Sequence, residues 1–111
     1  MKKIVNIDLD GVLNQYSGTF NEQEIPPIKK GAYDFIKKLS VNYEIEIFTV
    51  RDKNLTTNWL IENNLMGFIK NVTNEKNKFA SVFLDDRAIN FNGNFDLAFN
   101  LITTFSPYWK Q

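Results

Sequence analysis

The chain has 111 residues, of which 13 are basic and 13 are acidic. This length fits one domain, and the balanced charge gives no overall basic field to attract nucleic acid or an anionic membrane. Cysteine and histidine are both absent, which excludes disulfides, zinc sites of the usual kind, cysteine nucleophiles and Ser-His-Asp triads. Any catalysis must therefore use carboxylates, Lys, Arg, Tyr, hydroxyls or a hard cation such as Mg²⁺ held by oxygen atoms.

The first predicted strand runs into an acidic turn. Residues 3–6 are a short apolar run that predicts a buried strand, and Asp8, Asp10 and Gly11 follow it directly. If the extended geometry continues, both carboxylates point to the same side. At about 4 Å and an effective dielectric of about 20, they repel by roughly 4 kcal/mol, so a cation, a shared proton or water must offset the charge. An ordinary polar turn is the alternative.

Residues 14–27 are polar and contain Gly18 and Pro26-Pro27, which predicts a loop or flap. Tyr16 and Phe20 could fold this flap over whatever Asp8 and Asp10 bind, or they could pack a hairpin onto the domain.

Helices and strands alternate through the rest of the chain. Apolar spacing predicts helices at about 29–40 and 52–64, the second with Asp52 as N-cap, and a last helix that is broken near Pro107. Strands are predicted at 43–50, 68–72 and 79–84. Residues expected to face inward are Ala32, Phe35, Ile36 and Leu39 in the first helix and Leu55, Trp59 and Leu60 in the second. Ala98, Leu101, Ile102 and Phe105 give the helical spacing of the last helix.

This alternation predicts a single α/β domain spanning residues 1–111, a three-layer sandwich whose mainly parallel sheet is covered on both faces. Ligands bind beyond the carboxyl ends of the strands in such folds. The polar residues expected there are Asp8, Asp10, Thr49, Arg51, Lys76 or Lys78, Asp85 and Asp86.

These residues fit phosphoryl chemistry when they are taken together. Three or four crowded carboxylates could hold a magnesium ion, and the ion, a lysine and a threonine hydroxyl would form a receptacle for a phosphoryl group. A carboxylate is then the natural nucleophile.

The sequence resembles a small, capless phosphatase of the haloacid dehalogenase superfamily. That family has Asp-x-Asp after strand one, Thr or Ser after strand two, a lysine before strand four and acidic residues after it. The corresponding residues are Asp8-Leu9-Asp10-Gly11-Val12-Leu13, Phe48-Thr49-Val50-Arg51, Lys76 or Lys78, and Phe83-Leu84-Asp85-Asp86-Arg87. The match runs from residue 3 to about residue 91.

The resemblance implies a mechanism in which Asp8 attacks phosphorus and becomes an aspartyl-phosphate. Asp10 would protonate the leaving oxygen and then activate water. Thr49 would hold a phosphoryl oxygen, and the lysine, with Lys76 favoured because small capless relatives show Thr-Asn-x-Lys, would offset negative charge. The implied ligands of Mg²⁺ are Asp8, the carbonyl of Asp10, Asp85 and, through water, Asp86.

Two arginines have open roles. Arg51 and Arg87 could contact substrate phosphate, or they could pair structurally with Asp52 or Asp86, and such exposed pairs contribute about 0 to 1 kcal/mol.

Neither gap between the motifs has room for a cap domain. The expected function is a phosphatase for a small phosphorylated substrate, selected by the flap, a neighbouring subunit or the substrate itself. One alternative is a polynucleotide 3′-phosphatase, whose domains share Asp-x-Asp-Gly and Asp-Asp-Arg, although the zero net charge and the lack of an aromatic and basic platform count against it. The other is a binding domain that has lost its chemistry.

No apolar run approaches about 18 residues, and the start lacks the features of a signal peptide, so a soluble cytoplasmic protein is expected. The substrate and the oligomeric state are not predicted, and Tyr108 and Trp109 could pack on the domain or on a partner.

Overall fold

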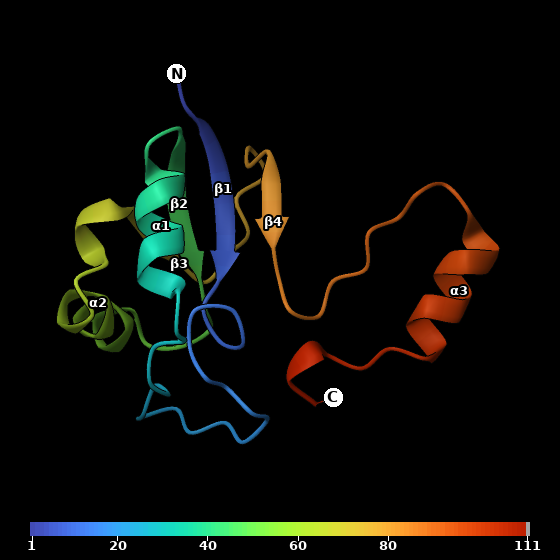
Figure 1. The fold of residues 1–111 in the computed structure, drawn as a ribbon, viewed down its shortest axis with the longest axis horizontal. Helices are drawn as coiled ribbons and strands as arrows, with labels where there is room; N and C mark the ends of the chain where they lie inside the picture. The colour runs from blue at the N-terminus through green and yellow to red at the C-terminus, as the bar shows by residue number, and fades with distance from the viewer. Residues whose placement is uncertain (111) are drawn as a thin grey trace.

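The structure is a computed structural model that describes residues 1–110 and forms an α/β fold on a parallel sheet. Within these residues the sheet has four strands in the order β3-β2-β1-β4, all parallel (Figure 1). The elements are β1 (Lys3–Asp8), α1 (Ala32–Ser40), β2 (Tyr43–Phe48), α2 (Lys53–Glu62), η1 (Met66–Phe68), β3 (Ile69–Thr73), β4 (Val82–Leu84), α3 (Phe95–Thr103) and η2 (Tyr108–Lys110). The predicted parallel α/β fold is confirmed at this level.

The core lies between the sheet and the first two helices. Val5 and Ile7 of β1 pair in register with Ile45 and Ile47 of β2, and all four side chains are buried. Period 2 places them on the same face of the sheet. They form one cluster with buried residues of the helices and the following turn, namely Ala32, Ile36, Trp59, Leu60 and Leu65.

The first two helices differ from the prediction at their ends. α1 begins at Ala32 rather than near residue 29, because Gly31 precedes it with φ 91, a left-handed conformation that a helix cannot contain. Phe35, which was expected to face inward, is 42% exposed, because Ala32 and Ile36 occupy the face toward the sheet. The predicted N-cap of α2 is confirmed, since the Asp52 carboxylate accepts a hydrogen bond from the backbone N–H of Leu55 at 2.9 Å.

The strand β4 is shorter than the predicted 79–84 and lies at the edge of the sheet. A turn takes the preceding residues out of the strand, because Asn77 accepts hydrogen bonds from the N–H groups of Phe79 and Ala80. All three residues of β4 are exposed.

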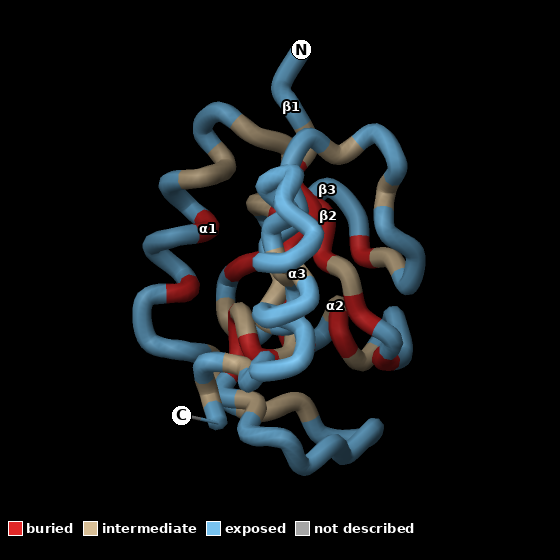
Figure 2. The backbone as a smooth tube through the Cα atoms, turned by 90° about the vertical axis from the view of Figure 1, so that its right-hand side faces the viewer, coloured by how far each residue is buried: buried red, intermediate tan, exposed pale blue. Residues whose placement is uncertain are grey.

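The expectation that helices cover both faces of the sheet is not met in residues 1–110. The opposite face carries Asn6 and Glu46, both buried, and Asn77 of the loop before β4 donates from Nδ2 to both oxygens of Glu46 at 3.1 Å. The helix α3 stands beyond the β4 edge (Figure 1) and has no buried residue, and almost all of it is drawn in the pale blue of exposed residues in Figure 2. The predicted third layer is therefore wrong for α3, because the extended chain after β4 carries it away from the sheet.

None of the described helices combines the length and the apolar character needed to cross a bilayer.

Candidate active site

Three carboxylates meet where β1 and β4 end. Asp8 is the last residue of β1, and Asp85 and Asp86 directly follow β4. The two strands are parallel neighbours, with Ile7 paired to Leu84, so their carboxyl ends reach the same edge of the sheet. One carboxylate oxygen from each residue lies within 4.8 Å of the others. We call Asp8, Asp85 and Asp86 the acidic cluster.

The acidic cluster has unequal proton affinities. Burial, the charge of Asp85 and the neighbouring carboxylate of Asp86 raise the pKa of Asp8 from 3.8 to about 7. Burial alone would also raise the pKa of Asp85, but the backbone N–H of Arg87 and the ammonium group of Lys76 lower it overall. The distances are 2.8 Å from Arg87 N to Asp85 Oδ1 and 3.2 Å from Lys76 Nζ to Asp85 Oδ2. Lys76 therefore balances the charge of Asp85, whereas no positive group lowers the pKa of Asp8.

Asp86 supplies the observation that tests whether a cation fits. Its Oδ2 accepts a hydrogen bond of 2.6 Å from Trp109 Nε1, whereas its buried Oδ1 has no hydrogen-bond donor among residues 1–110. An unpaired buried acceptor beside other carboxylates is costly unless positive charge is added. Three oxygen donors of this kind suit a hard divalent cation such as Mg²⁺, so the residues present fit the ion that the sequence predicts.

Gly11 allows the acidic cluster to close. Its φ is +80, and a Cβ atom placed there would lie 2.2 Å from Asp86 Oδ2 and 3.0 Å from Trp109 Nε1. Only glycine therefore combines this backbone conformation with so close an approach of Asp86.

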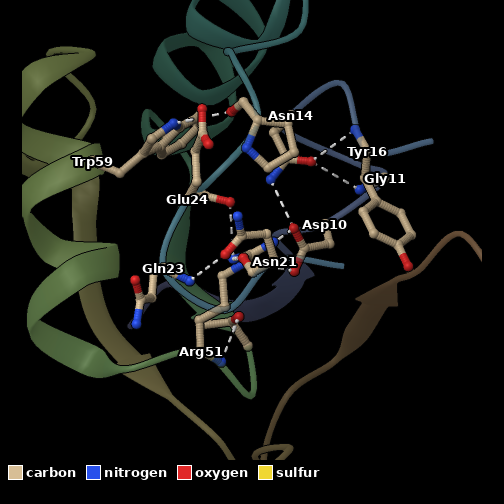
Figure 3. Close-up of polar contacts among 11 residues, drawn as sticks. Asp10, Gly11, Asn14, Tyr16, Asn21, Gln23, Glu24, Arg51 and Trp59 are labelled. Atoms are coloured by element: carbon tan, nitrogen blue, oxygen red, sulfur yellow. Dashed lines mark hydrogen bonds and ion pairs between the residues drawn. The ribbon is translucent and has the colours of Figure 1, made fainter. Parts of the chain in front are cut away.

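Asp10 lies outside the acidic cluster and is fixed by Arg51 (Figure 3). Arg51 Nε donates to Asp10 Oδ1 at 3.1 Å and to Oδ2 at 3.0 Å, and the arginine side chain is completely buried. Its Nη1 donates to the carbonyl oxygens of Asn21 at 2.7 Å and Glu24 at 3.3 Å, and its guanidinium lies 4.5 Å from the ring centre of Phe20.

Arg51 therefore joins Asp10 to the flap. The predicted pairing of Arg51 with Asp52 is wrong, because Asp52 caps α2 and Arg51 turns to Asp10. The flap covers the arginine, so the structure gives Arg51 a structural role and no direct support for a contact with substrate. The Asp10 carboxylate is bound by Arg51. That the backbone carbonyl of Asp10 is a ligand of Mg²⁺ stays a prediction.

Asn14 is a site residue that the sequence analysis missed. It is buried, and its Nδ2 donates to Asp10 Oδ1 at 2.9 Å (Figure 3). Its Oδ1 accepts from the backbone N–H groups of Gly11 at 3.2 Å and Tyr16 at 3.1 Å. Asn14 thus fixes the turn after β1, and a lone asparagine after an apolar run gives no sequence signal for such a role.

Thr49 and one of the two candidate lysines lie beside the acidic residues. Thr49 is buried directly after β2, and its Oγ1 accepts from the N–H of Arg51 at 3.1 Å, which leaves the hydroxyl hydrogen to be donated elsewhere. Lys76 contacts Asp85, whereas Lys78 Nζ lies over the ring of Phe79 at 5.2 Å. The structure therefore brings Lys76 and not Lys78 to the acidic cluster.

A cavity of about 480 Å³ opens at this edge of the sheet. Asp8, Asp10, Asp86 and Thr49 are among the residues that line it. Other lining residues are the aromatic side chains Tyr16, Phe20, Phe48 and Trp109 and the basic side chains Arg87 and Lys110. Arg87 is exposed and makes no ion pair with Asp86 in the described chain, so the predicted Arg87 to Asp86 pair is wrong and the side chain can meet a ligand.

The C-terminal turn η2 completes the cavity. Tyr108 donates its hydroxyl hydrogen to the carbonyl oxygen of Gly11, and the ring of Trp109 meets that of Tyr16 edge to face at 5.2 Å. Tyr108 and Trp109 therefore pack on their own domain. Tyr16, Trp109 and Lys110 are far apart in sequence and come together only in the fold, where all three line the cavity.

Comparisons with known proteins add no relative. No family model matches the chain, and no significant match was found among the curated proteins or the solved structures. The likeness to haloacid dehalogenase phosphatases accordingly stands on the four motifs and on their convergence at one edge of a parallel sheet.

Proposed function

We propose that the chain is a Mg²⁺-dependent phosphatase that hydrolyses a phosphomonoester through an aspartyl-phosphate on Asp8. The observation that carries the proposal is the meeting of Asp8 with Asp85, Asp86 and Lys76 beside a cavity, from separate parts of the chain. The same proposal makes the chain a capless, cytoplasmic member of the haloacid dehalogenase superfamily.

Asp8 is the nucleophile in this mechanism. With a pKa raised to about 7, about half of the Asp8 carboxyl groups are protonated at neutral pH in the metal-free protein, and a protonated carboxyl group is a poor nucleophile. Mg²⁺ held by the acidic cluster would supply positive charge that keeps Asp8 ionised and stabilises charge on the phosphoryl oxygens. Asp8 then attacks phosphorus, and the bond to the leaving oxygen breaks.

Asp10 moves the proton in the proposed mechanism. Arg51 and Asn14 fix its carboxylate at the wall of the cavity, where it can give a proton to the leaving oxygen and later take one from the hydrolytic water. The Thr49 hydroxyl can donate to a phosphoryl oxygen. Lys76 balances the charge of Asp85 and adds a cation to the site.

A phosphatase for nucleic-acid ends is the second candidate. Tyr16, Phe20 and Trp109 line the cavity together with the cations Arg87 and Lys110. Aromatic rings that accept bases and cations that meet backbone phosphates are the usual means of holding single strands. Selection for an oligonucleotide would therefore act through these aromatic and basic side chains, while the chemistry at Asp8 stays the same.

The test is phosphate release from p-nitrophenyl phosphate with and without Mg²⁺, by the wild type and by Asp8→Asn. The proposal expects Mg²⁺-dependent turnover that is lost in Asp8→Asn and kept in Asp34→Asn, a control at an exposed acid in α1. Unchanged turnover in folded Asp8→Asn would refute it.

A panel of sugar phosphates, nucleotides and end-phosphorylated oligonucleotides then separates the candidates. Preference for oligonucleotides over mononucleotides supports the second one. Mg²⁺ binding without turnover on the whole panel would instead indicate a binding domain.

A further inference from the structure

The segment 88–107, here called the arm, carries many of the apolar residues that the core leaves uncovered, namely Phe91, Phe95, Leu97, Phe99, Leu101, Ile102 and Phe105. It leaves the sheet after Arg87, forms α3 and returns to the cavity at Tyr108 (Figure 1). One residue of the arm is charged, Asp96. Most of the arm is exposed (Figure 2), although its apolar composition is typical of a buried element.

The helix α3 presents a defined apolar stripe. Phe95, Phe99 and Ile102 lie at helical spacing i, i+4, i+7 and are 80%, 70% and 65% exposed. Phe91 packs on Phe95 with ring centres 5.2 Å apart and extends the stripe. Asn94 caps the helix, its side chain accepting from the N–H of Leu97 at 3.0 Å, so the stripe belongs to a well-formed helix.

A matching acceptor surface exists on the same chain. The edge strand β4 exposes Val82, Phe83 and Leu84 at 50%, 45% and 38%. Exposed apolar edge strands are normally covered by another element or another chain, because they otherwise promote aggregation. The arm and β4 therefore both need a partner.

We propose that this chain forms a two-fold symmetric dimer in which the arm of each copy packs its apolar stripe on β4 of the other copy. In such a dimer the two symmetric contacts cover the arm and β4 of both copies at once. An unrelated partner would need two separate apolar faces to cover the arm and β4 of one chain. The proposal does not depend on the catalytic role of Asp8.

The available area is sufficient for such a dimer. At about 200 Å² for a whole phenylalanine side chain, the exposed parts of Phe91, Phe95, Phe99 and Phe105 amount to about 500 Å² per copy. That alone reaches the size of the largest apolar patch on ordinary monomers, about 300–600 Å². On the same scale, the exposed parts of Val82, Phe83 and Leu84 add at most about 270 Å² per copy, so two arms and two β4 strands give about 1,500 Å² in total, within the usual range for stable interfaces.

Charge argues against a membrane as the occupant. Helices that lie on membranes usually carry Lys or Arg on their polar face, whereas the arm has none and carries the negative Asp96. On the acceptor side, Lys78 lies in the loop before β4, where it offers the opposite charge to Asp96 of the other copy.

The first test is the mass of the full chain by light scattering after gel filtration, over a wide range of protein concentration. The proposal expects twice the chain mass of 13.0 kDa and a shift to a folded monomer in Ile102→Asp. Val41→Asp is the matched control, because Val41 is 67% exposed at the end of α1, away from the arm, and this variant should stay dimeric. A wild type that is monomeric at every concentration would overturn the proposal.

Crosslinking identifies the contact, because the chain has no natural cysteine. Mixing the Val82→Cys and Ile102→Cys variants and oxidising them should give a disulfide-linked dimer of the two different chains. Crosslinking of Ile102→Cys with itself alone would show that α3 packs on α3. A disulfide formed within one chain of the Val82→Cys/Ile102→Cys double variant would show that the arm covers its own strand. Either result would overturn the proposed interface.

Discussion

Replacing Gly11 with alanine tests the geometry of the site more selectively than removing a carboxylate. The new Cβ would lie 2.2 Å from Asp86 Oδ2 and 2.9 Å from Asp86 Cγ. Ordinary contact begins near 3.4 Å, so the carboxylate of Asp86 has to move by more than 1 Å. The hydrogen bond from Trp109 to Asp86 is disturbed at the same time, because Trp109 Nε1 is the next atom that the Cβ meets.

Two costs are expected, and they can be separated. The positive φ of Gly11 costs an alanine about 1–2 kcal/mol of stability, less a few tenths regained from the unfolded chain. Displacement of Asp86 acts on the cation, because Mg²⁺ tolerates little departure from its preferred geometry. A shift of about 1 Å in a site residue can lower a rate by about 100-fold.

The assay is chemical unfolding together with calorimetric Mg²⁺ titration of Gly11→Ala and Gly31→Ala. Gly31 has φ +91, and a Cβ atom placed there would have no neighbour within 4 Å, so this control bears the backbone cost without a clash. Gly31→Ala should lose about 1–2 kcal/mol of stability, and Gly11→Ala should lose more because its Cβ also displaces Asp86. Only Gly11→Ala should lose Mg²⁺ affinity, by about tenfold or more. Equal Mg²⁺ affinity in the two folded variants would refute the placement of Asp86.

Three further results are expected. The pKa of Asp8 is about 7 in the folded chain and 3.8 ordinarily, so between these pH values the folded chain binds more protons than the unfolded chain. The free energy of unfolding of the metal-free protein should therefore fall as the pH rises from about 4 to 7, and Asp8→Asn should flatten that slope in unfolding experiments. A slope unchanged by the substitution would contradict the burial of Asp8. Trp109→Phe removes a hydrogen bond to a carboxylate worth about 1.5–3 kcal/mol and should weaken Mg²⁺ binding about tenfold in a calorimetric titration, whereas Trp59→Phe, which removes the indole donor to the Pro26 carbonyl, should reduce stability alone. Lys76→Met should lower kcat by at least about tenfold through loss of charge next to the acidic cluster, while Lys78→Met should leave kcat unchanged; the reverse order would assign the lysine role to Lys78.

The strand ends could be predicted from local sequence. The apolar runs before Asp8, Thr49 and Asp85 end in polar residues, and a parallel sheet brings such ends to one edge. The N-cap at Asp52 was also predictable, because it depends on residues three positions apart. These features follow from short-range patterns and from topology.

The contacts that complete the site depend on distant residues. Arg51 reaches Asp10 across 41 positions, and Trp109 reaches Asp86 across 23. No periodicity indicates which of several carboxylates an arginine or an indole will meet. The apolar spacing of α3 predicted a helix correctly. It could not show that the apolar stripe of α3 lacks a partner within residues 1–110, because such a stripe has the same sequence pattern whether it packs on its own chain or on another.

Phosphorylation of Asp8 is the measurement that tests the central claim most directly. The protein would be quenched in acid during turnover with a phosphomonoester and analysed by peptide mass spectrometry. The proposed mechanism predicts phosphate on the peptide that contains Asp8, at the position of Asp8, only when Mg²⁺ is present. Phosphate release with no modification at Asp8, or modification of another residue, would contradict it.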